Sequence, residues 1–176
     1  AYDGILIACY GDPGLYAAKE ICDCPVLGIA ETSIAMSFLL GNRFSILAAS
    51  EKAVPMMEHM VAQYGMDHRL AGVFPLNMSV LDAEANRGET VSRLIEEGKK
   101  AVSKGAEVLI LGCAGMTGFG GPVSQALGIP VMDPVETSFL TLEMMCRGGF
   151  KTSKNGLYKP PGKKRIKREY LLTENI

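Results

Sequence analysis

The chain has 176 residues, of which 48% are hydrophobic and 21% are charged, a balance that is typical of a folded globular protein and argues against disorder. Its 18 basic and 19 acidic side chains leave a formal charge of -1, so no overall field favours nucleic acid or an anionic membrane as a partner. No apolar run approaches the roughly twenty residues that cross a bilayer, and the first residues do not resemble a signal peptide. These features predict a cytoplasmic protein that binds neither nucleic acid nor a membrane.

Short apolar segments alternate with helical patterns along the chain. The expected strands cover residues 4–10, 25–30, 44–49, 69–76, 106–113 and 129–133. The expected helices begin at Pro13, Glu31, Glu51, Ser79 and Val135. This alternation predicts an α/β protein with parallel sheets covered by helices on both faces. The residues from 151 onward are polar and rich in proline and glycine, which indicates an extension rather than another unit.

Several helix ends carry recognisable signals. Asp12 is placed as the N-cap of the first helix, and Ser50 as the N-cap of the helix over 51–65. Gly88 predicts a break in the long polar helix that begins at Ser79. The glycines within 115–122 follow no phosphate-loop pattern, so we interpret them as flexible backbone around a site.

Five cysteines and two histidines are the candidate metal ligands and disulfide partners. The cysteine count is odd, Cys22 and Cys24 lack a second closely spaced pair, and His59 and His68 are isolated. The spacing therefore supports neither a disulfide framework nor a zinc site. We expect free thiols and no metal.

An internal repeat links two distant parts of the chain. PVLGIAETS begins at Pro25 and PVMDPVETS begins at Pro130, so Pro-Val and Glu-Thr-Ser recur at an offset of 105 residues. Cys9 stands sixteen residues before Pro25, and Cys113 stands seventeen residues before Pro130, each at the end of an expected strand. A period this long predicts two homologous α/β halves related by a pseudo-twofold axis. Both cysteines then lie at the carboxyl ends of parallel strands, where open α/β sheets bind ligands.

Two equivalent thiols suit the inversion of a carbon stereocentre. One thiolate removes a proton from one face of the carbon while the opposite thiol delivers a proton to the other face. For this, each sulfur has to lie roughly 3–3.5 Å from the reacting position. The main-chain N–H groups of Gly11 and Gly115 are candidates to stabilise the enolate that forms, as in an oxyanion hole.

The segments that surround these cysteines are ACYGDPGL, PVLGIAE, RFSIL, LILGCAGM and LGIPVMDPVE, followed by a tail with the pattern TSK-G-Y-PP. Together they resemble the hydantoin and allantoin racemase branch of the aspartate/glutamate racemase superfamily over nearly the whole chain. The resemblance implies two sandwiched α/β halves and a two-base racemisation without a cofactor. It also implies a small-molecule substrate, either a 5-substituted hydantoin or an allantoin-like cyclic ureide, and a homo-oligomer.

The resemblance assigns the catalytic roles to Cys9 and Cys113. The residues expected to bind substrate are Tyr10, Gly11, Ala114, Gly115, Glu31 and Glu136. Residues 1–43 are expected to hold the remainder of an N-terminal α/β half, to which the C-terminal part returns, and residues 44–133 the second half with the second cysteine. Residues 134–176 form a closing helix and a polar tail. Because family members begin with a further strand and helix, we expect this chain to lack that N-terminal segment.

Other functions fit the same residues. Glutamate and aspartate racemases typically carry Asn-Thr after the first cysteine, whereas Tyr10 and Gly11 stand here, which disfavours a free amino acid as substrate. A maleate isomerase-like enzyme would add a thiolate to a double bond. An arylmalonate decarboxylase-like enzyme generally keeps one cysteine of the pair. A ligand-binding domain without catalysis is the third alternative.

Several residues also have a purely structural interpretation. Cys22, Cys24 and Cys146 are expected to be packing residues, and Glu31 and Glu136 either orient loops at the site or simply suit the start of a helix. Asp133 corresponds to Gly28 in the repeat, so the repeat gives no reason to assign it a role. The basic run at 163–169 predicts a solvated tail, with a weak anion or nucleic-acid contact as the alternative.

Overall fold

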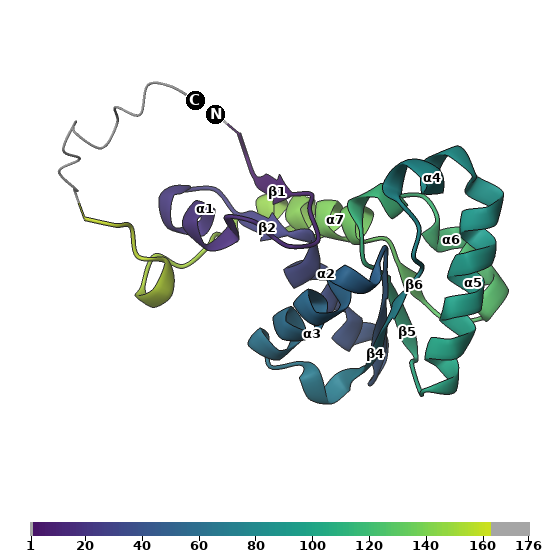
Figure 1. The fold of residues 1–176 in the computed structure, drawn as a ribbon. Coiled ribbons are helices and arrows are strands. Elements are labelled where there is room, and N and C mark those ends of the chain that lie inside the picture. The colour runs from purple at the N-terminus through teal and green to yellow at the C-terminus, as the bar shows by residue number, and fades with distance from the viewer. Residues whose placement is uncertain (1, 163–176) are drawn as a thin grey trace, which may run out of the picture.

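The computed structural model describes residues 2–162, in which parallel strands form two sheets flanked by helices (Figure 1). The smaller sheet pairs β1 (Ile5–Ile7) with β2 (Val26–Gly28). The larger sheet has the order β4-β3-β5-β6, and its strands are β3 (Phe44–Ala48), β4 (Leu70–Pro75), β5 (Val108–Leu111) and β6 (Val131–Met132). The α/β fold class predicted from the sequence is confirmed. The basic run at 163–169 lies outside the described residues.

Helices connect the strands in chain order. They are α1 (Leu15–Ile21), α2 (Ile29–Leu40), α3 (Val54–Gln63), α4 (Val80–Ala85), α5 (Arg87–Ser103), α6 (Gly120–Leu127) and α7 (Pro134–Arg147). Short 3-10 turns lie at η1 (Glu51–Ala53), η2 (Asp67–Arg69), η3 (Ala114–Met116) and η4 (Gly156–Tyr158). The predicted break in the long polar helix is present, two residues before Gly88, where Asn86 separates α4 from α5.

The central strands separate two apolar cores. Ile46 and Ile110 contact the core on the side of α2 and α3, whereas Leu47 and Leu109 contact the core on the side of α5 and α6. Successive side chains of a strand point to opposite faces, so one sheet supports both cores. Burial of each such side chain contributes about 1.5–3 kcal/mol to folding. These two cores fix the sheet whose carboxyl edge carries Cys113.

The two helices that begin within the sequence repeat pack against each other. α2 begins at Ile29 and α7 at Pro134, which reproduces the offset of 105 residues. Ala30 and Val135, which the repeat equates, both contact the core on the side of α2 and α3. α7 also contacts β1 and β2, so the chain returns to its first half after β6 (Figure 1). This arrangement agrees with two pseudo-symmetric halves that meet along α2 and α7.

Three local predictions are wrong. The predicted cover of helices on both faces implies a buried first strand, whereas β1 is half-buried and has a strand neighbour on one side alone within the described residues. The side chain of Ser50 makes no capping hydrogen bond, and a 3-10 turn precedes α3. The glycine-rich residues after Cys113 include the start of a regular helix, α6, since Gly120 and Gly121 occupy its first turn.

The segment after α7 lies across α1. The ammonium group of Lys154 donates hydrogen bonds to the carbonyl oxygens of Lys19, Glu20 and Cys22 at the end of α1. The ring of Tyr158 stacks edge-on against Tyr16. A cation that binds the last carbonyl groups of a helix satisfies acceptors that have no partner within the helix and complements the helix dipole.

Replacing Lys154 with methionine keeps the length of the side chain and removes its charge and its donors. We expect the free energy of unfolding to fall by roughly 1–2 kcal/mol, the net value of hydrogen bonds from a partly exposed charged group. Denaturant unfolding of Lys154→Met measures this change, with Lys159→Met, at an exposed position of the same segment, as the control. An equal effect of both substitutions would show that Lys154 does not hold the segment on α1.

Candidate active site at the two cysteine loops

Cys9 and Cys113 occupy equivalent positions in the two halves. Each lies two residues after the end of its strand, Cys9 after β1 and Cys113 after β5. The carbonyl oxygen of Cys9 accepts a hydrogen bond from the N–H of Asp12 at 2.9 Å, and that of Cys113 accepts one from the N–H of Met116 at 3.1 Å. The backbone therefore turns over the same number of residues after each cysteine. We call residues 8–14 the Cys9 loop and residues 112–118 the Cys113 loop.

The two loops lie against one apolar core. Tyr10 and Ala114, the residues directly after the two cysteines, both pack against the core on the side of α2 and α3. The chain runs from β3 to β4 and then returns across β3 to β5, so the strand order reverses between β3 and β5. Cys113 follows β5 at this reversal, which is where open α/β sheets form ligand-binding crevices. The thiol of Cys9 is exposed and that of Cys113 half-buried, so both reach solvent.

The glycines of the two loops present free main-chain donors. Among the hydrogen bonds formed by the described residues, none uses the N–H of Gly11 or Gly115. An N–H group without a protein acceptor is available to a developing negative charge. The geometry therefore agrees with the predicted role of these two glycines as enolate donors, which stays a prediction.

The side chain of Tyr10, a residue predicted to bind substrate, lies in the core. Tyr10 is 4% exposed, and its hydroxyl has no hydrogen-bond partner among the described residues. Burial raises the pKa of this phenol above its usual value, so the hydroxyl stays protonated. This packing leaves little of the Tyr10 side chain accessible to a substrate.

The two glutamates that the repeat equates differ in their surroundings. Glu31 accepts hydrogen bonds from the ammonium of Lys19 at 2.6 Å on both carboxylate oxygens, and the Lys19 side chain is 8% exposed. Glu136 is exposed at the start of α7. Glu31 is thus committed to a partly buried ion pair, while the carboxylate of Glu136 has no hydrogen-bond or ion-pair partner among residues 2–162. The two carboxylates thus differ in their partners, and a role of both glutamates in substrate binding stays a prediction.

Two aspartates that were not predicted as site residues connect the cysteine loops to α2 and α7. Asp12 is not the N-cap of α1, because Gly14 occupies that position; its carboxylate instead binds N–H groups at the start of α2. Asp133 is the N-cap of α7 and also accepts the N–H of Gly118 at 2.7 Å. Both precede a proline in the sequence, and the dipeptide Asp-Pro is the one signal that marks them as a pair.

The environment of Asp12 makes stability depend on pH. Burial raises the pKa of its carboxyl above the usual value of 3.8, while hydrogen bonds from the N–H groups of Glu31 and Ala30 act in the opposite direction. An acid whose pKa is higher in the folded state binds its proton more tightly there, so its ionisation disfavours folding as the pH rises through that pKa. Tyr64, whose own phenol pKa burial and Asp12 raise, stays protonated and donates to Asp12 at 3.4 Å.

We therefore expect wild-type protein to lose stability relative to Asp12→Asn as the pH rises above about 4, near the ordinary pKa of aspartate, since asparagine does not ionise. Urea unfolding of both proteins at several pH values measures the difference in the free energy of unfolding. Asp23→Asn, at an exposed position, is the control and should give a difference that does not change with pH in this way. A difference between wild type and Asp12→Asn that is constant with pH would contradict the assignment.

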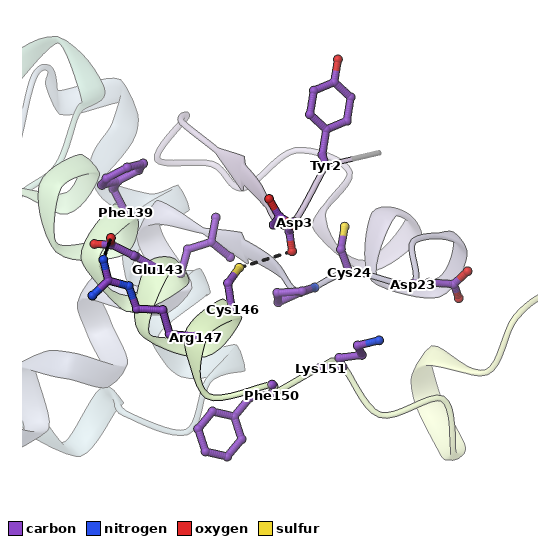
Figure 2. A pocket seen from close by; sticks show the side chains of 14 residues that line it. Tyr2, Asp3, Asp23, Cys24, Phe139, Glu143, Cys146, Arg147, Phe150 and Lys151 are labelled. Atoms are coloured by element: carbon purple, nitrogen blue, oxygen red, sulfur yellow. Dashed lines mark hydrogen bonds and ion pairs between the residues drawn. The ribbon is translucent and has the colours of Figure 1, made fainter.

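A separate groove lies at the smaller sheet. It has a volume of about 900 Å³ and is lined by Asp3, Cys24, Phe139 and Cys146, among others (Figure 2). The thiol of Cys146 donates a hydrogen bond to the carbonyl oxygen of Asp3 at 3.3 Å, drawn as a dashed line in Figure 2. Neither Cys9 nor Cys113 lines this groove, so it is distinct from the cysteine loops.

Residues 2–162 were also compared with the requirements of a metal site and of a membrane-spanning helix. Within this part of the chain, no group of three or more histidine, cysteine, aspartate or glutamate side chains is arranged to hold a metal ion. The helices of the same residues are all too short or too polar to cross a bilayer.

Comparison with known proteins places these observations in a family. The model of the family described as Asp/Glu/Hydantoin racemase matches residues 1–140. The chain belongs to this family. It is 42% identical over 163 residues to the hydantoin racemase of Pseudomonas sp. (strain NS671), a match that covers 92% of this chain and 66% of that protein. It is 39% identical to the hydantoin racemase of Paenarthrobacter aurescens, with 92% and 69% covered.

A solved structure agrees with the fold of this Asp/Glu/Hydantoin racemase family member. The crystal structure of allantoin racemase from Pseudomonas fluorescens superimposes with a TM-score of 0.90 at 29% identity, over 94% of this chain and 71% of that one. The chain spans about two thirds of the length of the curated relatives it matches. The family resemblance predicted from the cysteine motifs is confirmed.

Proposed function

We propose that this protein is a cofactor-independent racemase of 5-substituted hydantoins or of allantoin-like cyclic ureides, with Cys9 and Cys113 as its two catalytic residues. The observation that carries the proposal is the equivalence of the two cysteines: each follows its strand by two residues and begins the same turn. The similarity to hydantoin racemases and to an allantoin racemase supports the substrate class.

The reaction needs one proton on each side of the ring carbon. The thiolate of one cysteine takes the proton from the stereocentre, its sulfur becomes a thiol, and the electron pair of the broken C–H bond moves into the ring as an enolate. The other cysteine, present as a thiol, gives its proton to the opposite face and becomes a thiolate. After each turnover the cysteine that was a thiolate is a thiol, and the other is a thiolate. The enzyme is then ready to act on the opposite enantiomer, which is the reverse reaction.

The enolate places its negative charge on the ring carbonyl oxygen next to the stereocentre. The free N–H groups of Gly11 and Gly115 are the donors that we assign to this oxygen, and removal of one such donor in other enzymes reduces the rate by about 10²–10³-fold. Ala114, half-buried beside Gly115, lines the same turn. Glu136 is assigned to the polar groups of the ring, because its carboxylate is exposed whereas that of Glu31 is paired with Lys19.

The organisation of the whole protein is part of the proposal. We assign residues 1–43, with α7, to one half and residues 44–133 to the other, since α7 contacts α2, β1 and β2. A homo-oligomer and a cytoplasmic location are proposed from the family resemblance.

The experiment that tests the function is a racemisation assay with single enantiomers. The protein is incubated with L- and D-forms of several 5-substituted hydantoins and of allantoin, and the loss of optical rotation is followed against the rate without enzyme. We expect catalysed racemisation of at least one substrate from both enantiomers. Absence of catalysis for all of them would exclude the racemase. A covalent thioether adduct of Cys9 or Cys113 with an unsaturated dicarboxylate, detected by mass spectrometry, would instead favour the isomerase.

A further inference from the structure

Two buried carboxylates connect the cysteine loops to the paired helices. Asp12 is 7% exposed and Asp133 is 5% exposed, which is rare for aspartate unless its oxygens are hydrogen-bonded. Asp12 accepts the N–H of Ala30 at 3.1 Å on one oxygen and the N–H of Glu31 at 2.8 Å on the other. Neither carboxylate takes part in the proton transfers assigned to the cysteines, so their burial needs another explanation.

The donors to the two carboxylates are equivalent by the repeat. Asp133 accepts the N–H groups of Val135 at 3.0 Å and Glu136 at 3.2 Å, and these residues match Ala30 and Glu31 at the offset of 105. The carboxylates themselves come from different places in the sequence. Position 28, the repeat partner of Asp133, is glycine, and a Cβ built there would lie 2.3–2.5 Å from the carboxylate atoms of Asp12. The carboxylate of Asp12 therefore fills the space that a capping side chain at position 28 would need.

Each carboxylate is also connected to one cysteine loop: Asp12 lies within the Cys9 loop, and Asp133 binds the Cys113 loop. Asp12 is itself a residue of the Cys9 loop, and its N–H binds the carbonyl oxygen of Cys9. Its backbone has a φ of 42°, a left-handed conformation that residues other than glycine rarely adopt and that persists where the surroundings impose it. Asp133 reaches the Cys113 loop through the N–H of Gly118 at 2.7 Å and the hydroxyl of Thr117 at 3.5 Å.

We propose that Asp12 and Asp133 are positioning residues, Asp12 for Cys9 and Asp133 for Cys113, which hold each thiol loop against the first turn of α2 or α7. The inference rests on the proposed racemase function for its catalytic consequence. The two helices pack against each other, so loops fixed to their first turns are fixed relative to one another. A two-base reaction requires this, because each sulfur must stay within reach of the same carbon.

Asparagine separates this role from simple packing. It has the shape of aspartate and tolerates a left-handed backbone, but one of its two terminal groups donates instead of accepting. In Asp12→Asn, one of the two N–H groups of α2 loses its acceptor. In Asp133→Asn, the oxygen that binds the two N–H groups of α7 can be kept, and the acceptor for Gly118 is lost. Each substitution thus loosens one loop.

The first experiment measures the two thiols directly and needs no substrate. Wild type, Asp12→Asn, Asp133→Asn and the exposed control Asp23→Asn are treated with iodoacetamide, and the alkylation rates of Cys9 and Cys113 are obtained from peptide mass spectra. We expect Asp12→Asn to change the rate at Cys9 by about threefold or more and to leave Cys113 within about twofold, and Asp133→Asn to do the reverse. Equal changes at both cysteines, or no change at either, would overturn the proposal.

A second experiment tests the catalytic consequence. Exchange of substrate hydrogen for solvent deuterium is measured for each enantiomer. If Cys9→Ser abolishes the exchange of one enantiomer, Cys9 is the base that removes the proton from that enantiomer. Asp12→Asn should lower kcat for exchange of that enantiomer more than for the other, and Asp133→Asn should show the opposite preference. A merely structural role would lower both equally, and that result would contradict the inference. If no protein catalyses exchange, the proposed function fails while the alkylation result still stands.

A milder variant covers the case in which an asparagine variant does not fold. Tyr64→Phe removes the hydroxyl that donates to Asp12 at 3.4 Å and keeps both carboxylate bonds to α2. We expect a smaller change in the alkylation rate of Cys9 in the same direction, with Cys113 unchanged. Folding of each variant is checked by near-ultraviolet circular dichroism. A change at Cys113 in Tyr64→Phe would contradict the separate assignment of the two carboxylates.

Discussion

Substitution of either Cys9 or Cys113 by serine is expected to lower the rate of racemisation by about 10²-fold or more, the usual contribution of a positioned acid or base. A hydroxyl of serine is a much weaker acid than a thiol, so the altered side neither removes nor delivers a proton efficiently. The other cysteine still faces one enantiomer and can exchange its proton with solvent without inverting the carbon. Each variant should therefore keep exchange for one enantiomer, and the two variants should keep opposite ones.

Chiral chromatography in D2O, combined with mass spectrometry of each enantiomer, measures inversion and exchange together. Both thiols reach solvent, so we expect the serine variants to fold as wild type does. Cys22→Ser, which changes a half-buried thiol outside the two loops, is the matched control and should keep full activity. Two variants that lose exchange of the same enantiomer would show that the cysteines do not serve opposite faces.

The second large effect is expected at Gly112, the residue before Cys113. A Cβ at this position would lie 2.8 Å from the carbonyl oxygen of Leu47 and 2.9 Å from side-chain atoms of Ile46 and Met57. The carbonyl of Leu47 accepts the N–H of Gly112 at 2.8 Å, so β3 and the chain after β5 cannot separate without loss of this hydrogen bond. Gly112→Ala should therefore reduce the free energy of unfolding by about 1–3 kcal/mol, the range for overpacking in a core.

The same substitution should also displace the Cys113 loop and lower racemisation, because the strain falls one residue before the thiol. Gly121→Ala is the matched control, because among residues 2–162, apart from the chain neighbours and the backbone of α6 itself, no atom lies within 4 Å of a Cβ there. The residue is in the first turn of α6. Alanine in a helix is favoured over glycine by about 1 kcal/mol, so this control should be neutral or slightly stabilising. Equal stability of the two variants in denaturant unfolding would show that the close contact at Gly112 is not a constraint.

The sequence predicted the parts of the site that are local or repeated. Apolar runs such as 106–113 marked the strands, and the offset between the two ETS segments marked the two halves, because a strand or helix is determined largely by the pattern of its own residues. The positions of Cys9 and Cys113 follow from these two observations together. The free N–H groups of Gly11 and Gly115 follow from the same turn in both loops.

The features that depended on contacts between distant residues were not predictable. Asp12 binds the N–H of Ala30 in the first turn of α2, eighteen residues later in the chain, and the left-handed Gly14 is the N-cap of α1 in its place. A rule for local capping cannot detect a partner that the fold supplies. Glu31 resembled Glu136 by the repeat, yet Lys19, twelve residues from Glu31, forms an ion pair with Glu31 that the repeat does not indicate.

The burial of Tyr10 and the start of α6 have similar causes. Tyr10 follows a cysteine assigned to the site, but its ring lies in the core that the two halves share, and this core exists only in the folded chain. Gly120 and Gly121 lowered the expectation of a helix because glycine is a poor helix former. Packing of α6 against α5 and β6 offsets that preference.

The most direct test of the two-base reaction is the isotope content of each enantiomer early in turnover. One enantiomer of a racemised hydantoin or of allantoin is incubated with the protein in D2O, and remaining substrate and product are separated before one tenth has reacted. Two bases on opposite faces predict product that carries one deuterium at the stereocentre while the remaining substrate stays protonated. Product that retains the original hydrogen, or equal deuterium in both enantiomers, would indicate a single base and contradict the assignment of Cys9 and Cys113 to opposite faces.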